Sequence, residues 1–180
     1  MAPTHTVVRH VPDVASATAN FDAITYIKGS SVLKQLAAYV GEDAFVEGLR
    51  TYFRDHAYAN TSLDDLMGAF GAAAGEDLSS WTRDWLDRAG TDTLTLTDGR
   101  VEAVGPDGGT PRPHRVDIGC YARTDTGLEL VETVPVHLTG ASTTVALPDA
   151  DLHLLNDGDL TFAAVRADAE TTQALLDGAA

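Results

Sequence analysis

The stretch NFDAITYIKGSSVL, residues 20–33, places a tyrosine just before a lysine–glycine pair that opens an apolar helical pattern. A phenol with a pKa of about 10 stays protonated at neutral pH, so the Tyr26 hydroxyl could donate a hydrogen bond to an oxyanion. Taken by itself, a tyrosine flanked by Ile24 and Ile27 is more often an amphipathic packing residue. The surrounding sequence has to decide between these two interpretations.

Apolar residues recur at helical spacing on both sides of Gly41. Leu33, Leu36 and Val40 form a stripe that predicts a helix over residues 28–40, which Gly41 ends. Three further helices are predicted over residues 42–55, from a cap at residue 61 or 62 to residue 75, and over residues 78–90. Helices joined by such short connections form a compact helical unit.

The composition changes near Gly90, after which short runs of Thr, Val and Leu alternate with turn residues. Asp98-Gly99 is a hairpin signal between two of these runs. The predicted strands cover residues 94–96, 101–104, 115–123, 128–138, 143–147, 152–156 and 161–166. We therefore expect an α+β chain, with a helical domain over residues 1–90 and an antiparallel β-sandwich over residues 91–180 that ends in a short helix or tail.

Charge and composition exclude several classes of partner. The chain has 12 basic and 27 acidic residues, and a formal net charge of -15 repels nucleic-acid phosphates and anionic lipid. No apolar run is long enough to span a bilayer, and no leader pattern stands at the start. Cys120 is the only cysteine, so an intrachain disulfide is impossible, and we expect it to be a small buried residue in a strand. These features favour a cytoplasmic protein.

The histidines and acidic residues do not assemble into a metal motif in the sequence. No His-x-x-x-His pair occurs, and no histidine precedes a glutamate, so the helical zinc-protease motif is absent. Asn156-Asp157-Gly158-Asp159 resembles part of a calcium loop but lacks the required glutamate, so a tight turn between two strands explains it better. Surface positions are expected for His5, His10, His114, His137 and His153.

The pattern Tyr26-x-Lys28-Gly29-Ser30-x-Val32-Leu33 resembles the catalytic-tyrosine segment of the zinc aminopeptidases related to aminopeptidase N, which belong to the gluzincins. Three later segments strengthen the likeness. They are Gly41-Glu42-Asp43-Ala44-Phe45, His56-Ala57-Tyr58-Ala59-Asn60-Thr61 and Asn156-Asp157-Gly158-Asp159-Leu160-Thr161-Phe162.

The resemblance implies a fragment of a zinc aminopeptidase that removes N-terminal residues from peptides. Residues 1–90 would be the helical end of a thermolysin-like catalytic domain, and residues 91–180 the sandwich domain that follows it. Only Tyr26 carries over as a catalytic residue, as the oxyanion stabiliser, and no substrate-binding residue can be assigned. Zinc would be bound by the full-length parent and none is expected in this chain, so the isolated chain should be inactive.

The partners implied are a peptide substrate and the remaining domains of the parent, with no nucleic acid and no membrane. An alternative hypothesis is a stand-alone, non-enzymatic interaction module that keeps the fold of the lost enzyme and binds a partner through former interface surface.

Overall fold

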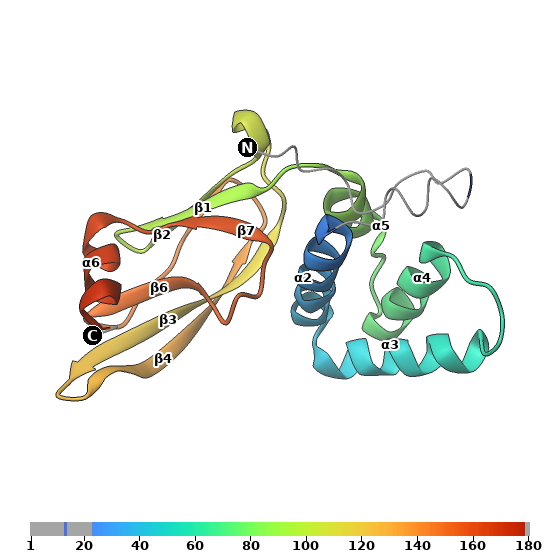
Figure 1. Cartoon of the computed structure of the whole chain (residues 1–180), viewed down its shortest axis with the longest axis horizontal. Coiled ribbons are helices and arrows are strands. Elements are labelled where there is room, and N and C mark those ends of the chain that lie inside the picture. Colours follow the sequence, from blue (N-terminus) through green and yellow to red (C-terminus); the bar gives the residue numbers. More distant parts are fainter. Residues whose placement is uncertain (1–12, 14–22, 179–180) are drawn as a thin grey trace. The chain divides into compact units, whose positions relative to one another are not determined.

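The computed structural model describes residue 13 and residues 23–178. It forms two compact units that divide between Ala89 and Gly90 (Figure 1). The first unit is helical, and the second contains two β-sheets and a C-terminal helix, so the predicted α+β class is confirmed. Within the described ranges, no helix has the length and apolar character needed to cross a membrane.

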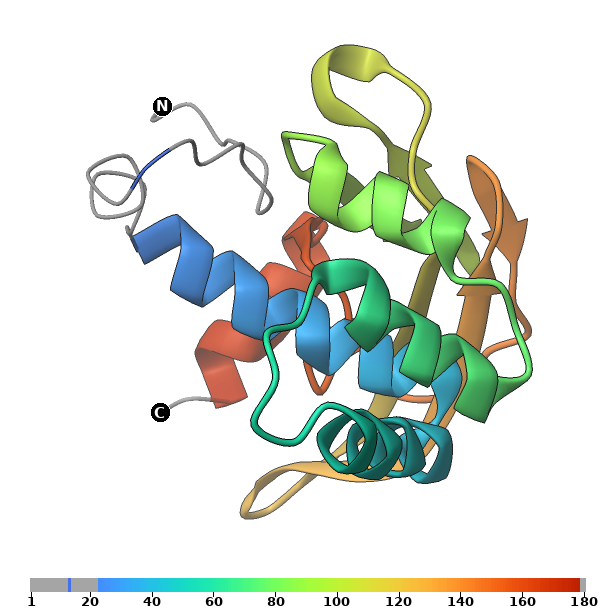
Figure 2. The same cartoon turned by 90° about the vertical axis from the view of Figure 1, so that its right-hand side faces the viewer.

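The helices of the first unit lie close to the predicted ranges. They are α2 (Ala23–Val40), α3 (Glu42–Asp55), α4 (Leu63–Ala74), α5 (Ser79–Thr82) and the π-helix η1 (Arg83–Asp87). Figure 2 looks down the axis of α3 and shows α2, α4 and the α5–η1 segment stacked above it.

The start of α2 differs from the sequence prediction. The helix begins at Ala23 rather than at Lys28, so Tyr26 lies within the helix and not before it. Residues 23–27 contain no glycine or proline, and extending an existing helix gains one hydrogen bond per residue without a new nucleus. The helix ends as predicted at Gly41, whose φ of 88° is a conformation that glycine adopts without steric cost.

Helices α3 and α4 are held together by close aromatic packing. Phe70 of α4 is fully buried and stacks on Phe45 of α3, with ring centroids 4.7 Å apart. A Cβ atom on Gly48 would lie 2.6 Å from the Phe70 ring, so the glycine permits this approach. Helix α4 begins with a capping box, in which Ser62 and Asp65 each accept a hydrogen bond from the other's backbone N–H.

The last predicted helix of this unit is shorter than expected, and its second part is a π-helix. The predicted helix over residues 78–90 consists of α5 followed by η1, and the helical stretch ends at Asp87. Trp81, Trp85 and Leu86 are all buried, as their spacing predicted. A π-helical turn is rare in proteins, and the apolar pattern alone does not distinguish it from an α-helix.

The second unit has its strands in two sheets (Figure 1). The strands of one sheet lie in the order β5-β2-β1-β7, and those of the other sheet lie in the order β4-β3-β6. Among the described strands all pairs are antiparallel except β1 with β7, which run parallel, in contrast to the wholly antiparallel arrangement expected. The strands are β1 (Asp92–Thr97), β2 (Arg100–Val104), β3 (His114–Thr124), β4 (Gly127–Leu138), β5 (Ser142–Thr144), β6 (Leu152–Asp157) and β7 (Ala163–Arg166).

Two short helical segments accompany these strands. A 3-10 turn, η2 (Pro106–Gly108), lies between β2 and β3, and helix α6 (Ala169–Gly178) follows β7. The β1–β2 hairpin turns at Asp98 and Gly99, whose φ angles of 49° and 73° are those of the tight turn that the sequence predicted.

Apolar residues from both sheets form one core in the second unit. Leu94 and Val101 come from the first sheet and Ile118 and Leu138 from the second, and each is at most 1% exposed. Cys120 belongs to the same cluster and is fully buried in β3, which confirms its expected role as a small core residue. Alternating burial along the strands therefore follows the period-two pattern of the sequence.

Candidate functional site

Tyr26 lies near the start of α2 and is 60% exposed. The exposure places its ring where a ligand could contact the hydroxyl, which a buried packing residue could not offer. Ile27 and Leu33 on the same helix are 64% and 46% exposed. The described part of α2 therefore presents a partly apolar surface around the tyrosine.

The opposite side of α2 is buried. Val32 is 2% exposed, Leu36 is fully buried, and two polar residues, Lys28 and Gln35, are at most 3% exposed. Residues at positions i, i+4 and i+7 or i+8 share one face of an α-helix, so these four side chains form a single inner face. This helix has apolar residues on two faces, whereas a surface helix has one apolar stripe.

The described residues do not fit a metal site. Within residues 23–178, no three His, Cys, Asp or Glu side chains lie close enough together to hold a metal ion. Tyr26 itself is not a preferred zinc ligand, since zinc sites in proteins use Cys, His, Asp and Glu. Among the described side chains of α2, the Tyr26 phenol is a group that can donate a hydrogen bond to a ligand.

The histidines occupy three different environments. His5 and His10 lie outside the described residues. His137 is exposed, as expected, whereas His153 is half-buried and its Nε2 lies 2.9 Å from the carbonyl oxygen of Pro148. The expectation of a surface position is wrong for His114, which is only 2% exposed.

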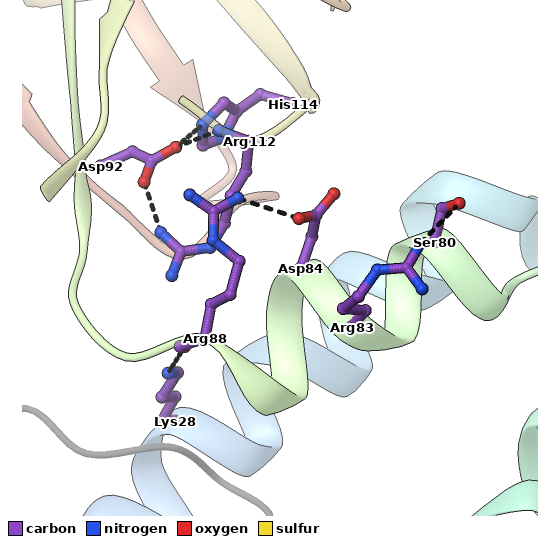
Figure 3. A network of polar contacts seen from close by, with 8 residues as sticks. All are labelled: Lys28, Ser80, Arg83, Asp84, Arg88, Asp92, Arg112 and His114. Carbon is purple, nitrogen blue, oxygen red and sulfur yellow. Dashed lines mark hydrogen bonds and ion pairs between the residues drawn. The ribbon is translucent and has the colours of Figure 1, made fainter. Parts of the chain in front are cut away.

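His114 belongs to a buried polar cluster that the sequence reasoning missed (Figure 3). Its Nε2 lies 3.1 Å from Oδ2 of Asp92, and its Nδ1 lies 2.8 Å from Oγ1 of Thr161. The backbone N–H of Arg112 donates to Asp92 Oδ2 at 2.6 Å, and the Arg112 guanidinium forms an ion pair with Oδ1. All four residues are at most 2% exposed. We call Asp92, Arg112, His114 and Thr161 the buried cluster.

The buried cluster joins the beginnings of three strands. Asp92 is the first residue of β1 and His114 the first of β3, while Thr161 lies two residues before β7. Burial by itself raises the pKa of Asp92, but hydrogen bonds from His114 and Arg112 and the charge of Arg112 outweigh it, so the pKa is lowered. A hydrogen-bonded series of an aspartate, a histidine and a hydroxyl can serve nucleophilic catalysis. In this cluster, however, Thr161, which supplies the hydroxyl, is buried. The arrangement therefore connects the two sheets rather than acting on a substrate.

Strand periodicity contains a signal that could have revealed this cluster. Asp92 shares a strand face with buried Leu94, and His114 shares one with buried Val116 and Ile118. A charged or titratable residue on the inward face of a strand needs a buried partner. The identity of that partner depends on the pairing of distant strands, which the local pattern does not specify.

The calcium-like segment is a turn, as predicted, and it supports the buried cluster. Asn156 has a φ of 61°, and its Oδ1 accepts hydrogen bonds from the backbone N–H groups of Leu160 and Thr161 at 3.1 and 3.2 Å. Its Nδ2 donates to the Thr161 carbonyl oxygen at 3.2 Å. The asparagine thus fixes the loop that carries the Thr161 hydroxyl.

Two aspartates on neighbouring strands form a further polar group in the second unit. Asp117 of β3 is paired with Asp157 of β6, and burial followed by the charge of Asp157 raises the pKa of Asp117. The Tyr121 hydroxyl donates to Asp157 Oδ2 at 2.9 Å. Burial, together with this hydrogen bond, raises the pKa of Tyr121. The Tyr121 hydroxyl is therefore hydrogen-bonded to the Asp157 carboxylate of the same chain.

The fold is shared with a solved aminopeptidase. The crystal structure of Legionella pneumophila aminopeptidase A in complex with aspartic acid matches with a TM-score of 0.67 and 15% sequence identity, covering 89% of this chain and 20% of that chain. At this identity the match shows the fold alone. The helical and sheet units of this chain therefore have an aminopeptidase-like α+β fold.

Sequence comparison relates the chain to a family of peptidases. Residues 1–85 match the peptidase family M1 domain. The chain is 40% identical to aminopeptidase N of Streptomyces lividans over 93% of its own length and 22% of that protein. Aminopeptidase M1 of Arabidopsis thaliana is 33% identical over 55% of this chain and 12% of that protein. Residues 1–85 therefore resemble the peptidase M1 family domain, and the chain spans about a fifth of the length of its aminopeptidase N relative.

Proposed function

We propose that this chain is a segment of a zinc-dependent aminopeptidase that removes N-terminal residues from peptides. In this proposal, residues 1–90 are the helical end of the catalytic domain and residues 91–180 are a β-sandwich domain. The observation that carries the proposal is Tyr26, an exposed tyrosine within the Tyr-x-Lys-Gly pattern of a segment that resembles the M1 family domain.

The proposed role of Tyr26 is to stabilise the transition state of peptide hydrolysis. Attack of water on a peptide carbonyl develops negative charge on the carbonyl oxygen, and a protonated phenol can donate a hydrogen bond to it. Loss of one such donor lowers kcat by about a hundredfold to a thousandfold. The hydroxyl acts as a donor and not as a base, so no proton leaves it during the reaction.

The zinc ion of the proposed enzyme would be held by residues outside this chain. The sequence has no His-Glu-x-x-His motif, and residues 23–178 do not supply a set of ligands. Zinc would polarise the substrate carbonyl and activate the water. The 180-residue chain alone is therefore proposed to be inactive, and the remaining domains of the parent are its proposed partners.

A chimeric enzyme tests the proposal. The matching segment of Streptomyces lividans aminopeptidase N is replaced by this chain, and hydrolysis of an aminoacyl p-nitroanilide is measured with zinc. The chimera should be active, Tyr26→Phe should lower kcat by about a hundredfold or more, and zinc content should not change. Tyr58→Phe is the matched control, because Tyr58 is a fully exposed tyrosine in the loop between α3 and α4.

Two results would overturn the proposal. One is a Tyr26→Phe chimera that keeps the kcat of the unsubstituted chimera. The other is hydrolysis by the isolated chain that is abolished by a chelator and by Tyr26→Phe. The interaction-module hypothesis instead predicts that a chimera folds and binds zinc but shows no turnover, since this segment would have lost its part in the chemistry.

A further inference from the structure

Lys28 is a buried lysine two residues after Tyr26 on α2. It is 3% exposed, whereas lysines are almost never fully buried unless they are paired. Its Nζ donates a hydrogen bond to the carbonyl oxygen of Arg88 at 3.3 Å (Figure 3). The buried lysine side chain therefore links α2 to the residue that follows η1.

The acceptor of this hydrogen bond belongs to a well-anchored segment. Trp85 and Leu86, which precede Arg88, are 1% and 7% exposed. The Arg88 guanidinium donates to Asp84 Oδ1 at 2.9 Å, one helical turn earlier (Figure 3). The C-terminal end of a helical stretch carries partial negative charge, which favours an ammonium group there. The Arg88 carbonyl is thus a fixed point for Lys28.

The geometry of an α-helix connects this anchor to the direction of Tyr26. Each residue turns the helix by about 100°, so side chains two positions apart point to nearly opposite sides. Lys28 and Val32 face inward, and Tyr26 faces solvent. Among the described side chains of the inner face, Lys28 lies nearest to Tyr26, because the next is Val32. Rotation or fraying of the first two turns would move the tyrosine ring.

We propose that Lys28 is a positioning residue for Tyr26. Its hydrogen bond to Arg88 fixes the start of α2 and thereby aims the tyrosine hydroxyl. This inference rests on the proposed function of Tyr26. It predicts that removal of the ammonium group lowers kcat through Tyr26, with little change in KM.

A double-mutant cycle in the chimeric enzyme tests the coupling. Lys28→Met keeps the apolar stem and removes the charge, and should lower kcat by about tenfold to a hundredfold, since a small misplacement of a catalytic group has effects of this size. In the Tyr26→Phe background, Lys28→Met should have no further effect on kcat. Lys28→Arg should restore part of the loss, and Lys34→Met, which removes an exposed lysine of the same helix, should change nothing.

The outcomes of this cycle separate the two proposals. If Tyr26→Phe leaves kcat unchanged, the proposed function fails. If Tyr26→Phe lowers kcat but Lys28→Met has the same effect in both backgrounds, only the positioning role fails, because Lys28 then acts on overall structure.

Hydrogen exchange on the 180-residue chain tests the anchor without any activity. In Lys28→Met, amides of residues 23–31 should exchange about tenfold faster, and those of β3 and β4 should be unchanged. The Lys34→Met control should match the unsubstituted chain. Equal protection of residues 23–31 in Lys28→Met and in the unsubstituted chain would overturn the proposal even if the chimera were not to fold.

Discussion

The start of α2 and the buried cluster are two polar regions of this chain that differ in exposure. The residue Tyr26 is 60% exposed, whereas Asp92, Arg112, His114 and Thr161 are at most 2% exposed. The buried cluster contains the richer set of chemical groups. Its groups are nevertheless satisfied by one another and closed to a substrate.

This difference shows that accessibility, more than the number of reactive groups, indicates which region can act on a ligand. Buried charges are compatible with folding only when they are paired and hydrogen-bonded, which makes such a cluster a structural element. An exposed side chain such as Tyr26 can instead be reached by a ligand. The first region should therefore be sensitive in catalysis and the second in folding.

Substitution of Asp92 should give the largest loss of stability. Asp92→Asn removes the negative charge that Arg112 faces, and breaking a buried pair on one side costs about 3–5 kcal/mol of unfolding free energy. The measurement is urea unfolding followed by circular dichroism. Asp125→Asn, at the exposed tip of the β3–β4 hairpin, is the matched control and should stay within about 0.5 kcal/mol. If Asp92→Asn lowered the free energy of unfolding only slightly, the buried cluster would not have the structural role described above.

The contribution of Asp92 should also depend on pH in one direction. Its pKa in the folded state is lowered from the ordinary value of 3.8, so the folded state favours the ionised carboxylate. The stabilisation is therefore fully present above pH 3.8 and is lost as the pH falls through the lower, folded-state pKa. The difference in stability between the unsubstituted chain and Asp92→Asn should shrink below pH 3.8. A difference that grows on acidification would contradict this assignment.

Local patterns predicted much of the fold but not the buried cluster. The bounds of α3 and the Asp98-Gly99 turn follow from short-range signals, namely helical spacing and paired turn residues. The start of α2 differs from the prediction because the helix extends past the lysine–glycine pair to Ala23, and no residue from 23 to 27 stops a helix. Asp92 and Arg112 are 20 residues apart, and only the packing of β1 against the entry to β3 brings them together.

The catalytic role proposed for Tyr26 rests on a motif and not on the physical properties of the surrounding sequence. By itself the sequence around it favoured a packing role, and exposure of the side chain is a result of how α2 packs. The local pattern also does not predict the partners of Lys28 and Gln35, two inward polar residues in the described part of α2, because spacing predicts the face of a residue but not its partner.

The helical unit should respond to packing changes more than to loss of charge. Gly48→Ala would place a Cβ atom 2.6 Å from the Phe70 ring and 3.0 Å from its Cα, so the α3–α4 contact must open. We expect a loss of about 1–3 kcal/mol in unfolding free energy. Gly68→Ala on α4, where a Cβ atom meets no atom within 4 Å, is the control and should stabilise by up to about 1 kcal/mol. Equal effects of the two substitutions would show that the close approach at Gly48 is not needed.

A smaller effect is expected at the start of α4. Ser62→Ala removes the side-chain acceptor of the Asp65 backbone N–H and one half of the capping box. The expected loss is about 1 kcal/mol, measured as a shift in the midpoint of thermal unfolding. Ser30→Ala on the exposed side of α2 is the comparison, since its hydroxyl only donates to the Ile27 carbonyl within the same helix. If Ser62→Ala lowered the midpoint of thermal unfolding no more than Ser30→Ala, the cap would contribute nothing to stability.

The most direct test of the central claim is the affinity of the Tyr26→Phe chimera for a phosphinic dipeptide, a stable mimic of the tetrahedral intermediate. If the hydroxyl stabilises the oxyanion, its loss should weaken analogue binding by about the same hundredfold or more as it lowers kcat/KM, while KM for the substrate stays nearly constant. Unchanged affinity for the analogue, together with a fall in kcat, would show that Tyr26 does not act on the oxyanion.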